Sequence, residues 1–328
     1  MAGAQSQEPR AGRLQVRARS RKLTAADVEG ARVDERSVVR HWLMRMTAHL
    51  VPTDDLGWLE PLFADRIRAQ SIRRLDALGV GASERDKALR AIRRALDVEG
   101  LLTRSDAMGV AERSGLKIDV ERRTHLSVLT VVGGPAFIGP DAGGGRTFAA
   151  RSDWLGPLKP RPREEALAEL ARRYFAAFSP ATERDFAYWS GLPLGDCREG
   201  MKRIAGELEP IGPGDSALIA MRGSVARAPR SPVVRLLGAF DTYLMGYASR
   251  GYAVDQAGAK EILPGGGILR PTICVDGRLV GTWRSKRVGR KLSVALEWFS
   301  EPDGDWAEAL AAEVEDIARF EGPEPTAA

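Results

Sequence analysis

The chain has 328 residues, 44% hydrophobic and 28% charged, so it is long enough for about two domains and is not disordered as a whole. Its 49 basic and 44 acidic residues leave a net charge of +5, and 41 of the basic residues are arginine. Arginine grips phosphate with a planar pair of donors, so this bias suits an anionic polymer as partner. A GC-rich coding sequence would raise arginine equally, and composition alone does not separate the two explanations.

Several classes of site are excluded. The only cysteines, Cys197 and Cys274, lie 77 positions apart, which leaves neither a disulfide framework nor a CxxC zinc site. Three histidines occur without an HExxH motif or a ligand cluster, so we expect no metal and no cofactor. The longest apolar stretch, 126–139, is too short and interrupted to cross a membrane, and the N-terminus lacks the apolar core of a signal peptide. We therefore expect a cytoplasmic protein without membrane association.

Three helix starts carry the same capping pattern, a threonine three residues before an aspartate. The hydroxyl accepts a hydrogen bond from an orphan amide, and the carboxylate complements the positive end of the helix dipole. The pairs are Thr24 with Asp27, Thr103 with Asp106, and Thr182 with Asp185. They lie 79 residues apart, twice over, which favours a repeated unit, although the spacing at the first copy can also be accidental.

The second and third copies predict winged helices. Helices are expected over 83–98, 103–115 and 122–132, followed by a hairpin of strands 136–138 and 147–149 around the turn 141–145. Three helices followed by a two-stranded wing are typical of a winged helix. The order recurs with helices over 164–178, 182–191 and 194–205 and strands over 208–211 and 217–221.

The first copy is incomplete, because only about 20 residues precede Thr24, too few for two helices with their turns. Strands over 38–44 and 47–51 resemble a wing, and a long helix follows the expected cap Thr53. Beyond residue 232 we expect strands over 268–275, 279–283 and 292–299 and an acidic amphipathic helix over 305–320.

The predicted fold class is α+β, with tandem winged-helix modules followed by a β-rich C-terminal region and a terminal helix. The expected modules are a first, N-terminally incomplete winged helix (1–81), a second (82–160), a third (161–232), a β-rich region (233–300) and a C-terminal helix with its tail (301–328).

Five sequence blocks together resemble a known family, the AlkZ-like winged-helix DNA glycosylases, which are related to the YcaQ-like proteins. The blocks are GAQSQ at 3–7, LTAADVE at 23–29, VVRHWLMRMTAHLVP at 38–52, LGAFDTYLMGY at 237–247 and VDGRLVGTW at 275–283. No single block is specific, but their order covers essentially the whole chain. The resemblance implies tandem winged helices around a basic channel and the excision of alkylated purines, in some members including interstrand cross-links.

The family's Gln-x-Gln pair corresponds to Gln5 and Gln7, which the resemblance therefore makes the catalytic residues. Alkylation at N7 or N3 gives the purine a positive charge, so the base leaves as a neutral group and no acid need protonate it. What remains is to hold a water on the open face of the sugar, and amide oxygens accept hydrogen bonds from such a water. The alternative is that both glutamines lie in a disordered tail.

The sequence departs from the family pattern at three places. Members carry about one or two further helices before the glutamine pair, whereas here Met1 stands four residues before Gln5, so the first module is expected to be shortened. The residue between the glutamines is usually aliphatic and here is Ser6, which removes a packing anchor. Met46 stands where the related block usually has glycine.

Four residues are expected to support the pocket: Arg45, Thr47, His49 and Asp241. Arg45 would face a phosphate and Asp241 would orient pocket groups, whereas the alternative for Arg45, Thr47 and His49 is an ordinary strand end. Ten residues in basic segments are candidates for DNA binding: Lys117, Arg122, Arg123, His125, Arg146, Arg284, Lys286, Arg287, Arg290 and Lys291. They lie at the start of an expected recognition helix, at a wing tip and on a C-terminal hairpin tip, where cations contact phosphates; solvated surface faces are the alternative.

The prediction is a monofunctional DNA glycosylase that binds double-stranded DNA with alkylated bases, works as a monomer and is associated with the nucleoid. It would hydrolyse the N-glycosidic bond of cationic alkylated purines, including those in interstrand cross-links, without a cofactor. The alternative is a DNA-binding protein or regulator that keeps the scaffold without the chemistry.

Overall fold

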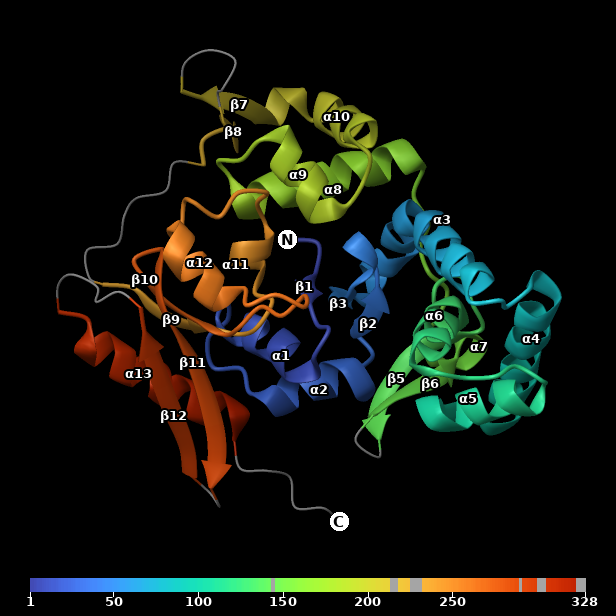
Figure 1. The fold of residues 1–328 in the computed structure, drawn as a ribbon. Helices are drawn as coiled ribbons and strands as arrows, with labels where there is room; N and C mark the ends of the chain where they lie inside the picture. The colour runs from blue at the N-terminus through green and yellow to red at the C-terminus, as the bar shows by residue number, and fades with distance from the viewer. Residues whose placement is uncertain (143–144, 213–217, 225–231, 289–290, 300–304, 323–328) are drawn as a thin grey trace. The chain divides into compact units, whose positions relative to one another are not determined.

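The computed structural model describes residues 1–328 except 143–144, 213–217, 225–231, 289–290, 300–304 and 323–328 (Figure 1). The described chain forms two compact units. The middle unit contains residues 31–170, and the N/C unit contains residues 1–30 together with 171–328. The unit boundaries fall within two helices, α2 Ala25–Val33 and α8 Arg163–Phe178. The five consecutive modules stay a prediction, since the compact units combine the two ends of the chain.

The middle unit contains an antiparallel sheet in the strand order β3-β2-β5-β6-β4, packed with helices. Its elements are β2 Val38–Trp42, η1 Met44–Met46, β3 Ala48–Pro52, α3 Thr53–Ala77, α4 Ala82–Glu99, β4 Leu101–Thr103, α5 Arg104–Arg113, α6 Val120–Val131, β5 Ala136–Ala142, β6 Gly145–Ala150 and α7 Arg151–Trp154. Trp58, Phe137 and Phe148 are among its largest fully buried side chains and form part of the hydrophobic core.

Within the middle unit, residues 82–150 run in the order helix, strand, two helices, hairpin. The short strand β4 pairs with β6, so β4 extends the hairpin to three strands, and α4 packs against α5 and α6. Thr103 and Asp119 cap α5 and α6 by accepting hydrogen bonds from Asp106 N (3.1 Å) and Arg122 N (2.8 Å). The three helices and the hairpin predicted for this stretch therefore form, with β4 as an additional strand.

The N/C unit contains two antiparallel sheets, β12-β11-β10-β9 and β7-β8. Its elements are β1 Ala4–Gln5, α1 Pro9–Arg17, α9 Glu183–Ser190, α10 Leu194–Arg203, η2 Ala205–Glu207, β7 Leu208–Ile211, β8 Leu218–Met221, β9 Val234–Leu237, α11 Thr242–Met245, α12 Gln256–Ile262, β10 Thr272–Val275, β11 Arg278–Val288, β12 Lys291–Trp298 and α13 Ala307–Glu321.

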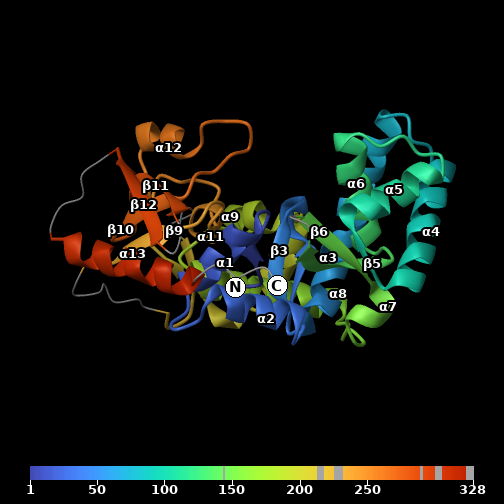
Figure 2. The same ribbon diagram turned by 90° about the horizontal axis from the view of Figure 1, so that it is seen from below.

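The four-stranded sheet has helices on both faces. Figure 2 shows α13 along one side of the strands and α12 on the other, and α13 contacts β9 and β12 while α12 contacts β11. Every residue of β10 is buried as a result. The turn between β10 and β11 has left-handed backbone at Asp276 (φ 48°) and Gly277 (φ 82°), as an Asp-Gly hairpin requires.

Around α8 and α9 an aromatic cluster holds the third predicted module together. Tyr174 stacks on Phe186 with ring centroids 4.9 Å apart, and Trp189 lies 5.2 Å from the same tyrosine. The capping box between Thr182 and Asp185 begins α9 as predicted. The expected strands also form, as β7 and β8.

The structure differs from the predicted elements at several places. Thr53 is the first residue of α3 rather than its cap, because its hydroxyl donates to Arg36 O (2.5 Å). The strand expected over 38–44 ends at Trp42, where the 3-10 turn η1 begins, and the strand expected over 268–275 begins only at Thr272. Finally, α1 forms in the segment before Thr24, for which no helix was assigned.

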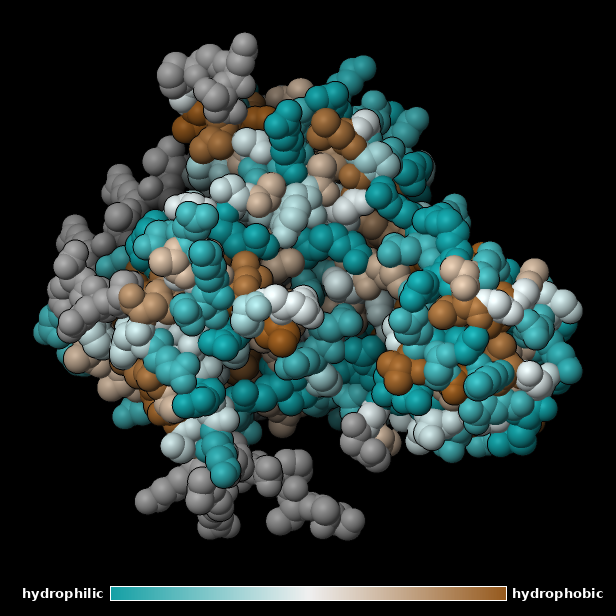
Figure 3. Space-filling model, in the orientation of Figure 1, coloured by the Kyte–Doolittle hydropathy of each residue, from teal (hydrophilic) through white to brown (hydrophobic). Residues whose placement is uncertain are grey.

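The surface carries its exposed hydrophobic side chains in separate places. Figure 3 shows hydrophilic residues over most of the visible face, with hydrophobic residues in spots. The most exposed large hydrophobic residues are Val98 (86%) and Val120 (72%), which belong to different helices. Among the helices of the described chain, none combines the length and the apolar character needed to span a membrane.

Candidate active site and nucleic-acid interface

The N-terminal segment is packed into the N/C unit. Gln5 is 3% exposed and Ser6 1%, whereas Gln7 is exposed. The following helix α1 begins with Pro9 at its first position and a buried face formed by Ala11, Leu14 and Gln15. The alternative of a disordered tail therefore does not describe Gln5 and Ser6.

Ser6 lies directly against α1. A Cβ built on Gly12 would stand 2.3 Å from Ser6 Oγ, so only glycine at position 12 leaves room for the serine. The sequence departure at position 6 is thus accommodated by a close contact between the segment and the helix that follows it.

Gln15 holds the Gln5 backbone to the 237–247 block. Its Nε2 donates to Gln5 O (2.6 Å) and Phe240 O (3.2 Å), and its Oε1 accepts from Thr242 N (3.2 Å). Gln15 is fully buried, so these bonds lie in an environment where unpaired backbone groups would be costly. Sequence reasoning missed Gln15; a glutamine between Leu14 and Val16 in α1 was the available signal.

Asp241 is fully buried and supports the same block. Its carboxylate accepts from Arg19 Nη1 (2.9 Å) and Nη2 (2.6 Å) and from Tyr243 N (2.8 Å). The two-pronged arginine contact fixes the carboxylate in one orientation. The preceding Phe240 adopts left-handed backbone at φ 56°. In the N/C unit, Asp241 therefore holds Arg19 and the backbone of Tyr243, next to Thr242, whose N–H donates to Gln15.

Arg45, Thr47 and His49 all lie in the middle unit, around the turn between β2 and β3. Arg45 (φ 52°) and Met46 (φ 59°) both have left-handed backbone, and Thr47 Oγ1 donates to Met44 O (3.0 Å). The turn thus presents Arg45, which is half-buried, from a strained position.

His49 is buried and neutral. Its Nδ1 lies 2.9 Å from Thr47 O, and burial together with the positive charge of Arg45 lowers the pKa of His49 to about 3, against the opposing hydrogen bond to Thr47. At neutral pH the imidazole carries no charge and is a poor proton donor. Its properties therefore fit a neutral hydrogen-bonding group.

A buried network of charged side chains around Glu60 in the middle unit was not predicted from the sequence. Glu60 Oε1 lies 3.2 Å from His41 Nε2 and accepts from Gly133 N (2.8 Å), and Arg151 forms an ion pair with the same carboxylate. Despite burial, the hydrogen bonds and charges of His41 and Arg151 lower the pKa of Glu60 to about 2. A glutamate within the apolar run at the start of α3 was the sequence signal that pointed to it.

The basic residues at the start of α6 differ in what they contact. Arg122 is engaged within the middle unit, where it forms an ion pair with Asp119 and its Nη2 donates to Leu78 O (2.5 Å). Lys117 and Arg123 are exposed. His125 is half-buried, its Nδ1 lies 3.3 Å from Ser71 Oγ, and burial beside Arg74 lowers the pKa of its imidazole. Lys117 and Arg123 are the residues of this set that present charge to solvent.

Arg146 lies on β6 against the sheet. Its guanidinium stacks 5.2 Å from the centroid of the Trp42 ring, and burial near Arg40 and Arg104 lowers the pKa of Arg146 to about 10. Two nearby arginines, Arg32 and Arg40, both reach Asp141, at 3.3 and 2.5 Å. Arg146 therefore belongs to a packed arginine group next to the hairpin.

The C-terminal hairpin β11–β12 carries the remaining candidates. Lys286 is exposed, and Arg284 is exposed while its Nη2 lies 2.9 Å from Glu297 Oε1 on the neighbouring strand. Arg290 lies outside the described residues, as do the side chains of Arg287 and Lys291. Two of the five predicted cations are thus placed, and both point away from the buried core.

The side chains that could bind a metal ion form no cluster in the described residues, and those that could react as a thiolate are buried. Among the described residues, no three His, Cys, Asp or Glu side chains are grouped as metal ligands would be. Both cysteines are buried free thiols, and burial raises the pKa of Cys197 to about 11 and of Cys274 to about 12. Neither is a thiolate at neutral pH.

The chain is similar to known proteins over almost its full length. A sequence profile of the family described as DNA glycosylase AlkZ-like matches residues 1–320. A protein of Streptomyces sahachiroi named "Interstrand DNA cross-link repair glycosylase" is 26% identical over 305 residues, which are 88% of this chain and 81% of that protein. The solved structure of Streptomyces sahachiroi DNA glycosylase AlkZ matches with a TM-score of 0.74 at 22% identity, covering 98% of this chain and 90% of that one.

The structural likeness confirms the predicted mixed α+β fold. The family match confirms the prediction of a DNA glycosylase, and with it DNA as the substrate. With 320 of its 328 residues matched, the chain belongs to the AlkZ-like family of DNA glycosylases.

Proposed function

We propose that this glycosylase hydrolyses the N-glycosidic bond of cationic N7- or N3-alkylated purines, with a water held by Gln5 and Gln7. The observation that carries the proposal is the packing of the first residues: Gln5 is buried, and Gln15 ties its backbone to the 237–247 block. A side chain that must aim a water needs a fixed backbone, and Gln5 has one.

The chemistry asks little of acids or bases. A cationic purine leaves as a neutral base, so the enzyme stabilises an oxocarbenium-like sugar and orients the water that attacks it. The glutamine amide oxygens would accept hydrogen bonds from that water, and no covalent intermediate would form. A neutral His49 and a low-pKa Glu60 agree with a reaction that needs no titrating group near pH 7.

Binding to the duplex would come chiefly from phosphate contacts. The exposed cations of the predicted set are Lys117 just before α6, Arg123 on α6, and Arg284 and Lys286 on the hairpin. Arg146 on β6 would add a further cation, whereas Arg32 and Arg40 are buried. We infer a monofunctional, monomeric enzyme that works on chromosomal DNA and is therefore cytoplasmic and associated with the nucleoid.

The substrates would include bulky adducts. The Streptomyces relative is named as a cross-link repair glycosylase, and we infer that this chain also releases a cross-linked base. An open site that need not enclose the base fully would admit such an adduct.

The experiment incubates the protein with a duplex that contains one N7-methylguanine, followed by alkali. Excision leaves an abasic site that alkali converts to a strand break, so breaks at the modified position are expected. Binding of the duplex without breaks would favour the alternative, a non-catalytic DNA-binding protein.

A further inference from the structure

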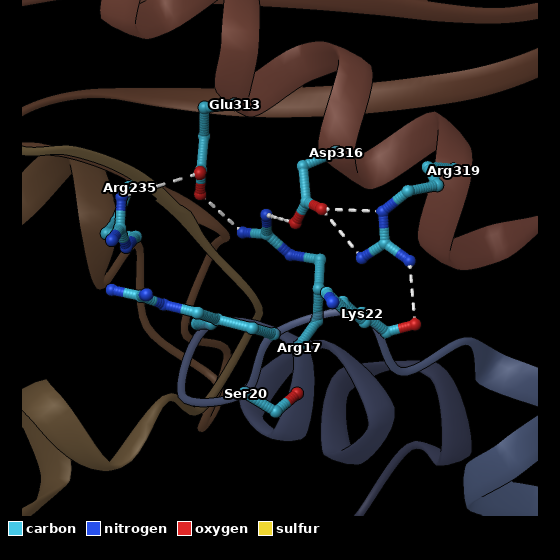
Figure 4. A pocket seen from close by; sticks show the side chains of 9 residues that line it. Arg17, Ser20, Lys22, Arg235, Glu313, Asp316 and Arg319 are labelled. Carbon is cyan, nitrogen blue, oxygen red and sulfur yellow. Dashed lines mark hydrogen bonds and ion pairs between the residues drawn. The ribbon is translucent and has the colours of Figure 1, made fainter.

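We propose that a pocket in the N/C unit, separate from the glutamine pair, binds the phosphate group of a nucleotide. The pocket has a volume of about 540 Å³ and lies between the end of α1, the segment that follows it, β9 and α13 (Figure 4). The glutamines precede α1 and the pocket lies at its other end, and a helix of nine residues is about 13 Å long.

The lining is strongly cationic. Five basic side chains line the pocket, namely Arg17, Arg21, Lys22, Arg235 and Arg319. Only two carboxylates, Glu313 and Asp316, face them, so the lining carries a formal charge of +3.

Both carboxylates form ion pairs with arginines of the pocket lining. Arg17, 3% exposed, lies between them with N–O distances of 2.5 Å to Glu313 and 3.0 Å to Asp316, as Figure 4 shows. Glu313 also accepts from Leu236 N (2.9 Å), and Asp316 accepts from Arg319 (2.7 and 2.9 Å). Both carboxylates of the pocket are therefore paired with arginines of its own wall.

Two cationic side chains of the lining, Arg21 and Lys22, remain without a partner in the described chain. The exposed side chains of Arg21 and Lys22 make no hydrogen bond or ion pair with any described residue. The Nε of Arg17 is buried and likewise has no acceptor among the described residues. A buried donor without an acceptor is rare in a folded protein, and here it adds to the excess of donors over acceptors around the pocket.

The segment that carries the two free cations is held in place at a conformational cost. Lys22 has left-handed backbone (φ 70°), which non-glycine residues rarely adopt. Arg319 Nη1 on α13 donates to Lys22 O (3.1 Å) and Leu23 O (3.0 Å), so the helix clamps this segment beside the pocket. The clamp keeps Arg21 and Lys22 at the pocket wall.

The ligand chemistry follows from charge and size. Arginine and lysine donors around a cationic pocket favour a phosphate, which accepts several charge-assisted hydrogen bonds. The pocket volume lies in the range of about 300–1,000 Å³ usual for organic ligands, so it has room for more than the phosphate itself. The phosphate can belong to a free nucleotide or to a DNA strand.

The experiment compares wild type with the double variant Arg21→Gln/Lys22→Asn. Asparagine tolerates left-handed backbone, so the second substitution removes the charge without added strain. The matched control is Arg184→Gln/Lys202→Gln, which removes two exposed charges from α9 and α10 of the same unit. Binding of adenosine 5′-monophosphate is measured by calorimetry and binding of an undamaged duplex by fluorescence anisotropy, with thermal unfolding as the check of folding.

Loss of adenosine monophosphate affinity by tenfold or more in the double variant, with the control unchanged, would establish a free nucleotide as the source. If the mononucleotide does not bind wild type but duplex affinity falls fivefold or more below that of the control, the phosphate belongs to DNA. If the double variant equals the control in both measurements, the proposal is wrong. Excision plays no part in this test, so its result stands apart from that of the proposed reaction.

Discussion

His49 illustrates how burial decides what a single residue offers. The sequence places it in a block with a family resemblance, where a histidine suggests acid–base chemistry. In the folded chain it is buried beside Arg45, and its pKa falls to about 3. A property that depends on the surroundings of a side chain follows from the tertiary fold, and no local pattern in the sequence contains it.

We predict that His49 makes the protein sensitive to mild acid. The unfolded chain takes up a proton near pH 6.5 but the folded chain only near pH 3, so the free energy of unfolding falls as the pH decreases through that window. Between pH 7 and 5, wild type should lose about 2 kcal/mol more than His49→Gln. Urea denaturation at both pH values measures the difference, and equal losses in the two proteins would contradict the assigned pKa.

Met46 tests the strain in the turn that presents Arg45. Its left-handed backbone favours glycine, the residue that the related block usually has, and a non-glycine residue there costs about 1–2 kcal/mol. Met46→Gly should therefore leave the free energy of unfolding within about 1 kcal/mol of wild type, because relief of strain offsets the flexibility of glycine.

The matched variant is Met44→Gly, whose side chain is fully buried and whose backbone is not left-handed. It should lose about 3 kcal/mol or more through the cavity it creates. Similar losses in the two variants would show that the turn is not strained at Met46.

Gln15 is expected to act through Gln5. Gln15→Ala leaves Gln5 O, Phe240 O and Thr242 N without their partner, which should cost about 2 kcal/mol or more of stability. The single-turnover excision rate should fall at least tenfold while duplex affinity stays within twofold. Gln256→Ala, an exposed glutamine of the same unit, serves as the control. Parallel losses of rate and affinity would mean that Gln15 serves the fold alone.

At the scale of elements, the sequence predicts what is local. The threonine caps, the glycine that ends α4, the Asp-Gly turn and most helices follow from residues within a few positions of one another. The exceptions have non-local causes. Thr53 bonds Arg36 across the β2–β3 hairpin, and Arg122 reaches Leu78 at the end of α3, so a residue expected to cap and one expected to bind DNA serve tertiary contacts.

The same limit applies to the candidate site. The resemblance points to Gln5 and Gln7, and Asp241 is a further candidate from the sequence. The bonds that join the Gln5 backbone to the 237–247 block pass through Gln15 and span more than 200 positions. Likewise, the group formed by Arg146, Trp42 and Arg40 arises from pairing between β2, β5 and β6. Pairings at such separation leave no periodic pattern in the sequence.

For the hairpin β11–β12 we predict one substitution that strengthens duplex binding and one that weakens it. Glu297 pairs with the exposed Arg284, so Glu297→Gln should release that cation and strengthen duplex binding severalfold at low salt. Lys286→Gln should weaken binding and reduce the slope of log affinity against log salt by about 0.9. Fluorescence anisotropy titrations from 50 to 200 mM salt, over which the Debye length falls by about half, measure both the affinity and the slope. Unchanged slopes in both variants would remove the hairpin from the interface.

At the scale of the whole molecule, the chain is organised into two units that each carry part of the predicted chemistry. The N/C unit holds the glutamine pair, Asp241 and the hairpin, and the middle unit holds Arg45, Thr47, His49 and the α6 cations. The N/C unit combines the first 30 residues of the chain with the last 158, so the two ends of the sequence form one unit. The length of the chain suggested about two domains, but the fact that one unit is built from two separate segments depends on long-range packing.

The central claim is that two neutral amides aim the attacking water. Single-turnover excision of N7-methylguanine, measured for wild type, Gln5→Ala and Gln7→Ala with duplex affinity in parallel, tests it most directly. We predict a loss of rate of about 100-fold or more in each variant, with affinity within twofold of wild type, because the glutamines would act in the transition state and not in binding. Excision at the wild-type rate in both variants would contradict the account.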